Sequence, residues 1–416
     1  QTPFFITKTN PRKPRFHYPP KKSIIKMSDP AQKAPTPETL GYKPAQKQLC
    51  WTVLILLMML PFFISVHPGI QTVLYSTTCV ILGCLYAIEF DQPGNRVNQF
   101  DEKMNWTDTL SFPIYASGAL LTLYFLYSVL PKELLNSLFR LNFCVLGFSI
   151  LFPFLMSKMG TLFPAVPNKD FGKFEKKIWG TDVAFDISTH SLIAAGISLL
   201  MVTLYFFTGH WSLNNVLAIT FTVAGIKLLR IPNFKYSLVL LWMLFFYDIY
   251  WVFKTDVMVS VAKSFDAPIK IFFPIDTSFK KFSLLGLGDM VIPGICIAVI
   301  LKFALDRQIQ QRQKSKKDAG ALTMAEVNAW GTPMFHITML FYFLSIVVTL
   351  VGMHLMKHAQ PALLYIVPAI TLAFASIGYI FKCYKEMMEY EDDIVGVEPV
   401  DNSKKEEAKP VEKENK

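Results

Sequence analysis

The feature that most constrains this chain is a series of long apolar runs with few charged residues. Ten such segments lie between two polar ends of the sequence. Most are about 18–22 residues long, which is enough for a helix to cross the roughly 30 Å apolar core of a bilayer. The segments comprise residues 50–66, 69–89, 112–130, 136–157, 188–208, 212–229, 236–253, 283–301, 335–356 and 361–381. We therefore expect an all-α fold, a polytopic bundle of membrane helices.

The composition supports a membrane protein and argues against other classes. Hydrophobic residues make up 52% of the chain and aromatic residues 14%. Soluble domains rarely combine such values with charge-free runs of this length. The formal net charge of +10 lies mainly in the ends and connections, where it indicates topology, so we expect no nucleic-acid partner. The six cysteines form no CxxC pair, so we expect buried, inert thiols and neither a zinc site nor a disulfide framework.

Basic connections between the segments predict the orientation of the bundle. They lie at 158–177, 227–235 and 307–317, separated by even numbers of spans. The positive-inside rule makes their shared side cytosolic, and the C-terminal end falls on that side too. The segment 50–66 is short and contains Pro61, so it could span, re-enter or lie at the interface. The sequence therefore leaves nine or ten spans open.

The expected domain organisation has four parts. Residues 1–48 are rich in Pro, Lys and Arg and are expected to form a disordered basic tail. Residues 49–67 hold the extra apolar segment, whose topology is left open. Residues 68–382 form the membrane-embedded domain, and residues 383–416 are expected to be a disordered charged tail.

Two aspartates stand alone in these apolar runs. Asp248 is the only charge between Lys235 and Lys254, and Asp289 is the only charge between Lys281 and Lys302. A carboxylate at the centre of a membrane helix costs about 2.5–3.5 kcal/mol on insertion scales, so such a residue indicates function by default.

The bracketing lysines allow the depth of each aspartate to be compared. Asp248 lies six residues before Lys254, and Asp289 lies eight residues after Lys281. At about 1.5 Å per helical residue, the two carboxylates would lie roughly 9 and 12 Å below the lumenal ends of antiparallel helices. We expect them to face one another and, as close carboxylates, to hold one proton between them. Such a pair suits peptide hydrolysis, with one group activating water and the other polarising the carbonyl.

Two alternatives to hydrolysis remain open for this pair. Each aspartate could form an ion pair that only stabilises the bundle, although no Lys or Arg at that depth is evident. The pair could instead relay protons in a proton-coupled transporter or channel.

Two short motifs accompany the aspartates. Gly286 and Gly288 flank Leu287 directly before Asp289, and glycines there weaken a helix and let another backbone approach. An extended substrate could pair with exposed main-chain groups at this point, although ordinary small-residue packing is the alternative. Pro361, Ala362 and Leu363 open the last apolar segment, where proline suits a first helical turn and leaves the preceding backbone irregular.

His354 and His358 have the i, i+4 spacing of two metal ligands on one helix face. The Glu of an HExxH motif is absent and no third ligand is evident, so we reject a metalloprotease and expect no metal site.

Together, Tyr247-Asp248 within FYDIYWVF, the GLGD of 286–289 and the QPAL of 360–363 resemble the three motifs of the presenilin and signal peptide peptidase intramembrane aspartyl proteases. The segment VMVSVAKSFDAPIKIFFP at 257–274 is similar to the signal peptide peptidase branch, as are KHAQPALLYIVPA at 357–369, SLNNVLAITF at 212–221 and the MVIPGI that follows GLGD. The resemblance covers roughly residues 68–382.

The resemblance implies an enzyme with nine core spans in the endoplasmic reticulum membrane and a cytosolic C-terminus. Its substrates would be signal-peptide remnants and type II-oriented membrane helices within the lipid bilayer. Asp248 and Asp289 would be catalytic, with Tyr247 and the backbone of 286–288 beside them and residues 361–363 shaping the substrate side. No metal or organic cofactor is implied, and water is the co-substrate. Self-association, quality-control partners and a protease-dead scaffold that captures helices remain open.

Overall fold

The computed structural model describes residues 44–64, 66–90, 104–156, 158–162, 166–178, 181–229, 231–255, 257–275, 279, 281–315, 332–356 and 360–391. Most of the two expected tails, 1–48 and 383–416, lies outside these residues.

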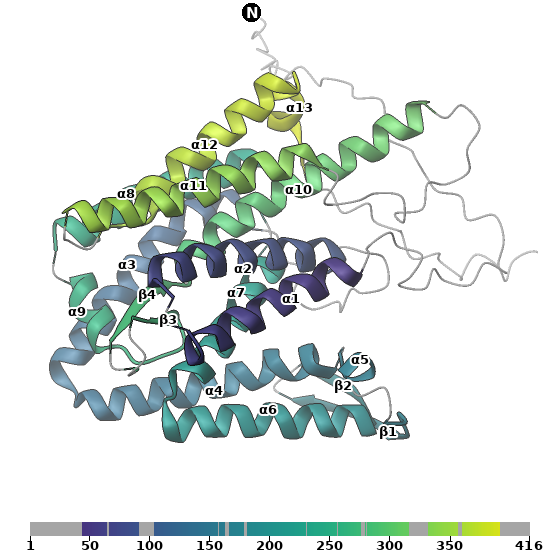
Figure 1. Ribbon diagram of the computed structural model, residues 1–416, viewed down its shortest axis with the longest axis vertical. Coiled ribbons are helices and arrows are strands. Elements are labelled where there is room, and N and C mark those ends of the chain that lie inside the picture. The colour runs from purple at the N-terminus through teal and green to yellow at the C-terminus, as the bar shows by residue number, and fades with distance from the viewer. Residues whose placement is uncertain are drawn as a thin grey trace, which may run out of the picture.

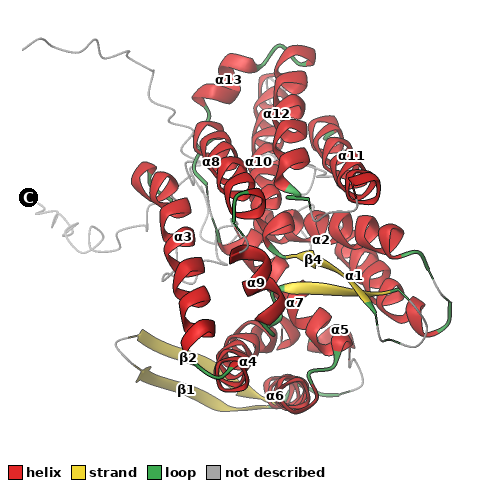
Figure 2. Ribbon diagram, turned by 90° about the vertical axis from the view of Figure 1, so that its left-hand side faces the viewer, coloured by secondary structure: helices red, strands yellow, loops and turns green. Residues whose placement is uncertain are grey.

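Helices make up most of the described chain (Figures 1 and 2). In chain order they are α1 (Pro44–Met59), the 3-10 helix η2 (Leu60–Phe62), α2 (Pro68–Phe90), α3 (Trp106–Val129), α4 (Lys132–Met156), α5 (Met159–Leu162), α6 (Thr189–Thr208), α7 (Trp211–Leu228), α8 (Phe234–Phe253), α9 (Val257–Ser264), α10 (Gly288–Ser315), α11 (Pro333–Met356), α12 (Leu363–Ile380) and α13 (Tyr384–Glu389). The strands are β1 (Asp170–Ile178), β2 (Thr181–Ser188), β3 (Lys270–Pro274) and β4 (Phe282–Gly286).

Eight of the described helices are long and apolar enough to cross a membrane: α2, α3, α4, α6, α8, α10, α11 and α12. The expectation of a helical, multi-pass membrane protein is confirmed. Helix α7 carries Asn214, Asn215 and Lys227 and falls outside this set, although it occupies the interior of the bundle.

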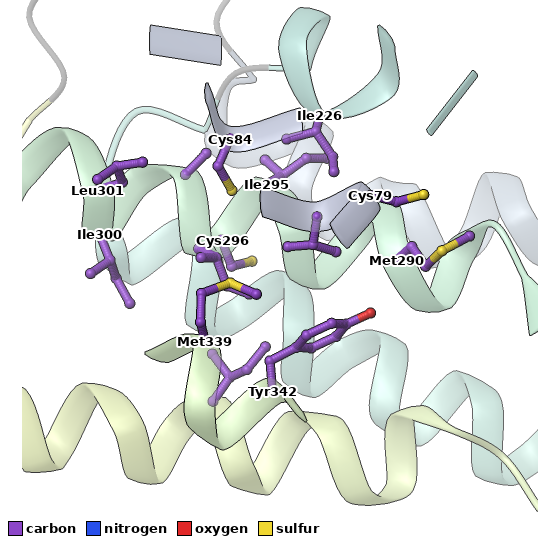
Figure 3. Packing of buried hydrophobic residues seen from close by; sticks show 14 of the residues in the cluster. Cys79, Cys84, Ile226, Met290, Ile295, Cys296, Ile300, Leu301, Met339 and Tyr342 are labelled. Atoms are coloured by element: carbon purple, nitrogen blue, oxygen red, sulfur yellow. The ribbon is translucent and has the colours of Figure 1, made fainter. Parts of the chain in front are cut away.

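The centre of the bundle is formed where α2, α7 and α10 pack together. Ile226 of α7 lies between Gly83 of α2 and Gly294 of α10, where an added Cβ would approach the Ile226 side chain to 2.6 and 2.5 Å. Figure 3 shows Ile226 beside Cys84 and Ile295 in this core. Glycines at such crossings let helix backbones approach closely in a membrane, where packing rather than the hydrophobic effect drives association.

The periphery is formed by α3, α4 and α6, which expose many apolar side chains. Exposed examples are Ile114, Leu121, Val145, Leu199 and Phe207. In a membrane protein these surfaces face lipid, which is as apolar as the side chains themselves.

The extra N-terminal segment is a helix that starts earlier than expected, at Pro44 rather than at residue 50. Helix α1 is followed by η2, which contains Pro61. The chain then reverses, so that α2 packs against α1 in the opposite direction (Figure 1). Cys50, Leu54 and Leu57 of α1 are buried in the main core. The start of α1 lies at the same end of the bundle as the far end of α10 (Figure 1).

Two antiparallel hairpins interrupt the helices, and neither was expected from the apolar pattern. In the first, β1 pairs with β2 before α6. In the second, β3 pairs with β4 directly before α10, with Lys270 opposite Gly286 and Pro274 opposite Phe282. The hairpins lie at opposite ends of the bundle (Figure 1).

The structure also differs at the inner end of the expected C-terminal tail. Residues 384–389 form α13, and Met387 is buried in the main core. Arg307 of α10 donates to the Phe381 carbonyl and pairs with Glu386, which ties this helix to the bundle.

Candidate active site

Asp248 is positioned by α8. The side chain of Asn233 accepts a hydrogen bond from the Tyr236 N–H at 3.1 Å and so caps the start of this helix. Asp248 lies in the fourth turn, where its residue is only 5% exposed. The backbone N–H of Leu363, the first residue of α12, lies near its carboxylate. The first N–H groups of a helix lack intrahelical partners and carry positive potential, so they suit a carboxylate.

Asp289 lies in the first turn of α10, directly after β4. Residues 282–286 are strand rather than helix, so the expected rise of 1.5 Å per residue between Lys281 and Asp289 was wrong. Because short strands and helices can both be apolar, the pattern alone did not separate them. A carboxylate in a first turn is favoured by the helix dipole.

The main-chain carbonyl of Asp289 is bonded by a side chain from another helix instead of by the usual helix N–H. Pro293, four residues on, has no N–H and cannot donate to the Asp289 carbonyl. The hydroxyl of Tyr342 on α11 donates to that carbonyl instead, at 3.3 Å. Tyr342 is fully buried, and Figure 3 shows it beneath the start of α10, near Met290.

The two aspartates lie close enough for their charges to interact. Ion pairs are found between Arg140 and Asp266 and between Arg307 and Glu386. Within the described part of the chain, neither Asp248 nor Asp289 takes part in an ion pair. The alternative of a purely stabilising ion pair therefore has no support among these residues.

Gly286 and Gly288 differ in their surroundings. A Cβ at Gly286 would lie 3.3 Å from Oδ2 of Asp289, whereas one at Gly288 would meet nothing within 4 Å. Leu287 donates its N–H to the Ile269 carbonyl at 2.9 Å and so extends the hairpin ladder up to the aspartate. The absent side chain at Gly286 therefore leaves room for the carboxylate.

The remaining expected residues lie around Asp248. Pro361 and Ala362 precede α12 rather than entering it, and the Pro361 carbonyl accepts from Leu364 N–H at 3.2 Å. Tyr247 is partly buried against the main core, with its ring 6.3 Å from that of Trp251. Motifs that lie far apart in the sequence thus meet through Asp248, Asp289 and Leu363.

Hydrogen-bonded and non-hydrogen-bonded residue pairs alternate along β3 and β4, and this alternation shows which main-chain groups point away from the partner strand. The bonds Leu287 N–H to Ile269 O and Ile275 N–H to Lys281 O mark the hydrogen-bonded pairs. Antiparallel pairs alternate, so the main-chain groups of Leu284 and Gly286 point away from β3. Among the described residues, no hydrogen bond is found for these outward groups. An open strand edge therefore runs up to Asp289.

Lys270 stands opposite Gly286 at the end of this hairpin. Its ammonium donates to the Ala262 carbonyl at 2.6 Å. Burial lowers the pKa of Lys270, although the Asp266 carboxylate acts in the opposite direction.

Sequence reasoning missed three residues near the site: Tyr342, Asn214 and Asn215. Pro293 was a usable signal for Tyr342, because it predicts a free carbonyl at Asp289. The adjacent asparagines in an apolar run were also a signal, because buried amides need partners.

In the described part of the chain, no three His, Cys, Asp or Glu side chains gather as metal ligands. His358 lies outside the described residues.

The fold and the site define a multi-pass membrane protein with two interacting carboxylates among its helices. A profile of the family described as signal peptide peptidase matches residues 96–393. The chain belongs to the signal peptide peptidase family of intramembrane proteases.

Several relatives share this family. The signal peptide peptidase of Homo sapiens is 36% identical over 312 residues, which cover 72% of this chain and 77% of the human protein. The signal peptide peptidase of Mus musculus is also 36% identical, over 72% of this chain and 76% of the mouse protein. Intramembrane protease 2 of Caenorhabditis elegans is 41% identical over 189 residues, which cover 44% and 39% of the two chains.

Proposed function

We propose that this chain is an aspartyl endopeptidase that hydrolyses peptide bonds within transmembrane helices. Its substrates are signal-peptide remnants and type II-oriented membrane proteins of the endoplasmic reticulum, and its C-terminus is cytosolic. The observation that carries the proposal is the interaction of Asp248 with Asp289 beside an open strand edge.

The chemistry needs one proton shared by the pair. The ionised aspartate removes a proton from water, and the water oxygen adds to the carbonyl carbon of the substrate. The protonated aspartate donates to the carbonyl oxygen as charge develops there. Collapse of the tetrahedral species breaks the C–N bond. The leaving amine takes a proton from the pair, and a hydroxyl of the tetrahedral carbon returns one to it, so the pair again holds a single proton. Because the two groups titrate as a unit, the acid and base roles belong to the pair.

The open edge of β4 supplies the substrate geometry. A helix hides its own main-chain groups, so a scissile bond must become extended before attack. A strand added along Leu284 and Gly286 would pair with their outward main-chain groups. The next part of that strand then lies at Asp289, with Leu363 and Asp248 opposite. Residues 361–363 and Tyr247 border the same space.

The test is a cleavage assay with Asp248→Asn and Asp289→Asn, which keep the size of each side chain. Purified protein reconstituted with a signal peptide should lose at least about 100-fold in cleavage rate for either variant. Asp108→Asn is the control, because Asp108 is an exposed capping residue of α3. The thermal unfolding temperature of each variant should show that it folds.

Retained cleavage in either site variant, with product masses unchanged, would overturn the proposal. A transporter would instead show proton-coupled flux in sealed proteoliposomes without any cleavage product, and a protease-dead scaffold would bind the peptide and leave it intact.

A further inference from the structure

Asn214 and Asn215 are two adjacent amides near the start of α7, in a part of the bundle lined by apolar residues. They are 2% and 1% exposed. A buried amide without partners is costly, since it loses its hydrogen bonds to water. Both side chains therefore need specific partners inside the protein.

Both partners lie on the outer edge of β3. Asn214 donates from Nδ2 to the Lys270 carbonyl at 2.7 Å. Asn215 donates from Nδ2 to the Phe272 carbonyl at 2.8 Å and accepts from the Phe272 N–H at 2.8 Å. The hydroxyl of Tyr205 on α6 donates to Oδ1 of Asn214 at 3.4 Å, which holds that amide in turn.

The Asn215 amide thus bonds to Phe272 as a neighbouring strand would. Phe272 and Lys270 are the β3 residues whose main-chain groups point away from β4. Edge groups of this kind otherwise form a template for a further strand. With the asparagines in place, the Lys270 carbonyl and both main-chain groups of Phe272 are occupied on the side of β3 away from β4.

We propose that Asn214 and Asn215 are positioning residues that close the outer edge of β3, so that a substrate strand adds along β4 alone and in one register. This inference rests on the proposed function. Because β3 fixes β4 through the ladder, the asparagines also hold Gly286 beside Asp289. They act through the hairpin and do not touch the reacting atoms.

The first measurement is kcat, KM and product mass for Asn215→Leu, which keeps a similar volume but has no polar atoms. We expect kcat/KM to fall by about 10- to 100-fold, since small misplacements at a site have effects of that size. New products should appear, cut one or two residues from the main site. Asn214→Leu should show a smaller loss, because Asn214 makes one bond to β3 where Asn215 makes two.

The matched control is Thr220→Val on the same helix. Thr220 is buried, and its hydroxyl donates to the Val216 carbonyl of α7 itself. This variant should keep kcat/KM within about twofold, and it should give the wild-type products. A general loss of packing in α7 would affect the control as well.

Hydrogen exchange of peptides covering residues 268–275 gives a readout that needs no cleavage. The Phe272 amide should exchange at least about tenfold faster in Asn215→Leu than in wild type. Its exchange rate should be unchanged in Thr220→Val. If Asn215→Leu does not fold, the test rests on Asn214→Leu, which removes only the bond to the Lys270 carbonyl and should give the smaller loss together with the shifted products.

Two results would overturn the inference: wild-type products and kcat/KM in both leucine variants, or unchanged exchange at Phe272. If wild-type protein does not cleave the peptide, the proposed function fails, and exchange at Phe272 still decides whether the asparagines hold β3.

Discussion

The two hairpins of this molecule have the same architecture but very different support. Strand β3 is held by Asn214 and Asn215 and lies against α7 and α2. The contacts of β1–β2 with other elements lie mainly at its base, where Thr189 N–H donates to the Lys169 carbonyl at 3.0 Å at the start of α6. Figure 2 shows β1–β2 at the margin of the molecule.

The difference explains how a strand can position chemistry in a membrane protein. An isolated two-stranded hairpin is marginally stable in water. In β3, Ile271 and Phe273 are fully buried, and the ring of Phe273 lies 5.2 Å from that of Tyr75. This packing fixes one strand, so the other can leave its edge open without losing its place.

Each hairpin contains a glycine, Gly286 in β4 and Gly172 in β1. The largest expected effect on cleavage comes from replacing Gly286. Gly286→Val adds a branched side chain where Cβ alone would lie 3.3 Å from Oδ2 of Asp289. We expect cleavage to fall by about 100-fold or more, because the carboxylate must move. The measurement is kcat/KM on a reconstituted signal peptide.

Gly172→Val is the matched substitution in β1, where φ is +137° and a Cβ would meet nothing within 4 Å. The substitution strains the backbone of β1 at this position. It should leave cleavage unchanged, because the first hairpin lies at the other end of the bundle. Equal losses in both variants would contradict the distinction between the hairpins.

A second comparison concerns stability. Phe273→Ala removes a fully buried ring from β3 and should lower the free energy of unfolding by about 3–5 kcal/mol. Phe171→Ala removes a ring that is 63% exposed in β1 and should change it by less than about 0.5 kcal/mol. Denaturant unfolding in detergent measures the change in free energy of unfolding for both variants. Similar changes in the two variants would contradict the stronger packing of β3.

The smallest expected effect tests the open edge itself. Leu284→Pro removes one outward N–H from β4 but none of the bonds to β3, because Leu284 is in a non-hydrogen-bonded pair. One lost hydrogen bond to substrate should raise KM by about 5- to 10-fold. Leu284→Ala keeps the N–H and controls for the half-exposed side chain. A KM that rises equally in the alanine variant would mean that substrate reads the side chain and not the edge.

The sequence was sufficient for the helical, multi-pass fold, and it nominated the residues of the candidate site, whose roles stay a prediction. Long apolar runs predicted the spans, and the isolation of Asp248 and Asp289 predicted the pair. Strand β4 was not predicted, because its residues, Phe282–Gly286, carry no charge and continue without a break into the apolar start of α10. The strand is recognisable only from its partner β3, and pairing between distant segments leaves no local period in a sequence.

The early start of α1 was missed for a related reason. Residues 44–49 are polar by pattern, yet Lys47 is buried and its ammonium lies 4.3 Å from the ring centroid of Tyr86 on α2. The long aliphatic stem and the ring together make a polar residue fit a helix–helix contact. Such a fit depends on the neighbour, which the sequence of the segment does not reveal.

The expectation of buried thiols was confirmed, and it has a practical consequence. All six cysteines of the chain are free and buried, spread over α1, α2, α4, α10 and the start of α13. Water-soluble alkylating reagents should therefore find no ready thiol on the folded protein. A single cysteine introduced at an exposed position such as Leu284 becomes a unique chemical handle. A spectroscopic label attached there could follow the arrival of a peptide at the strand edge without removing any native residue of the core.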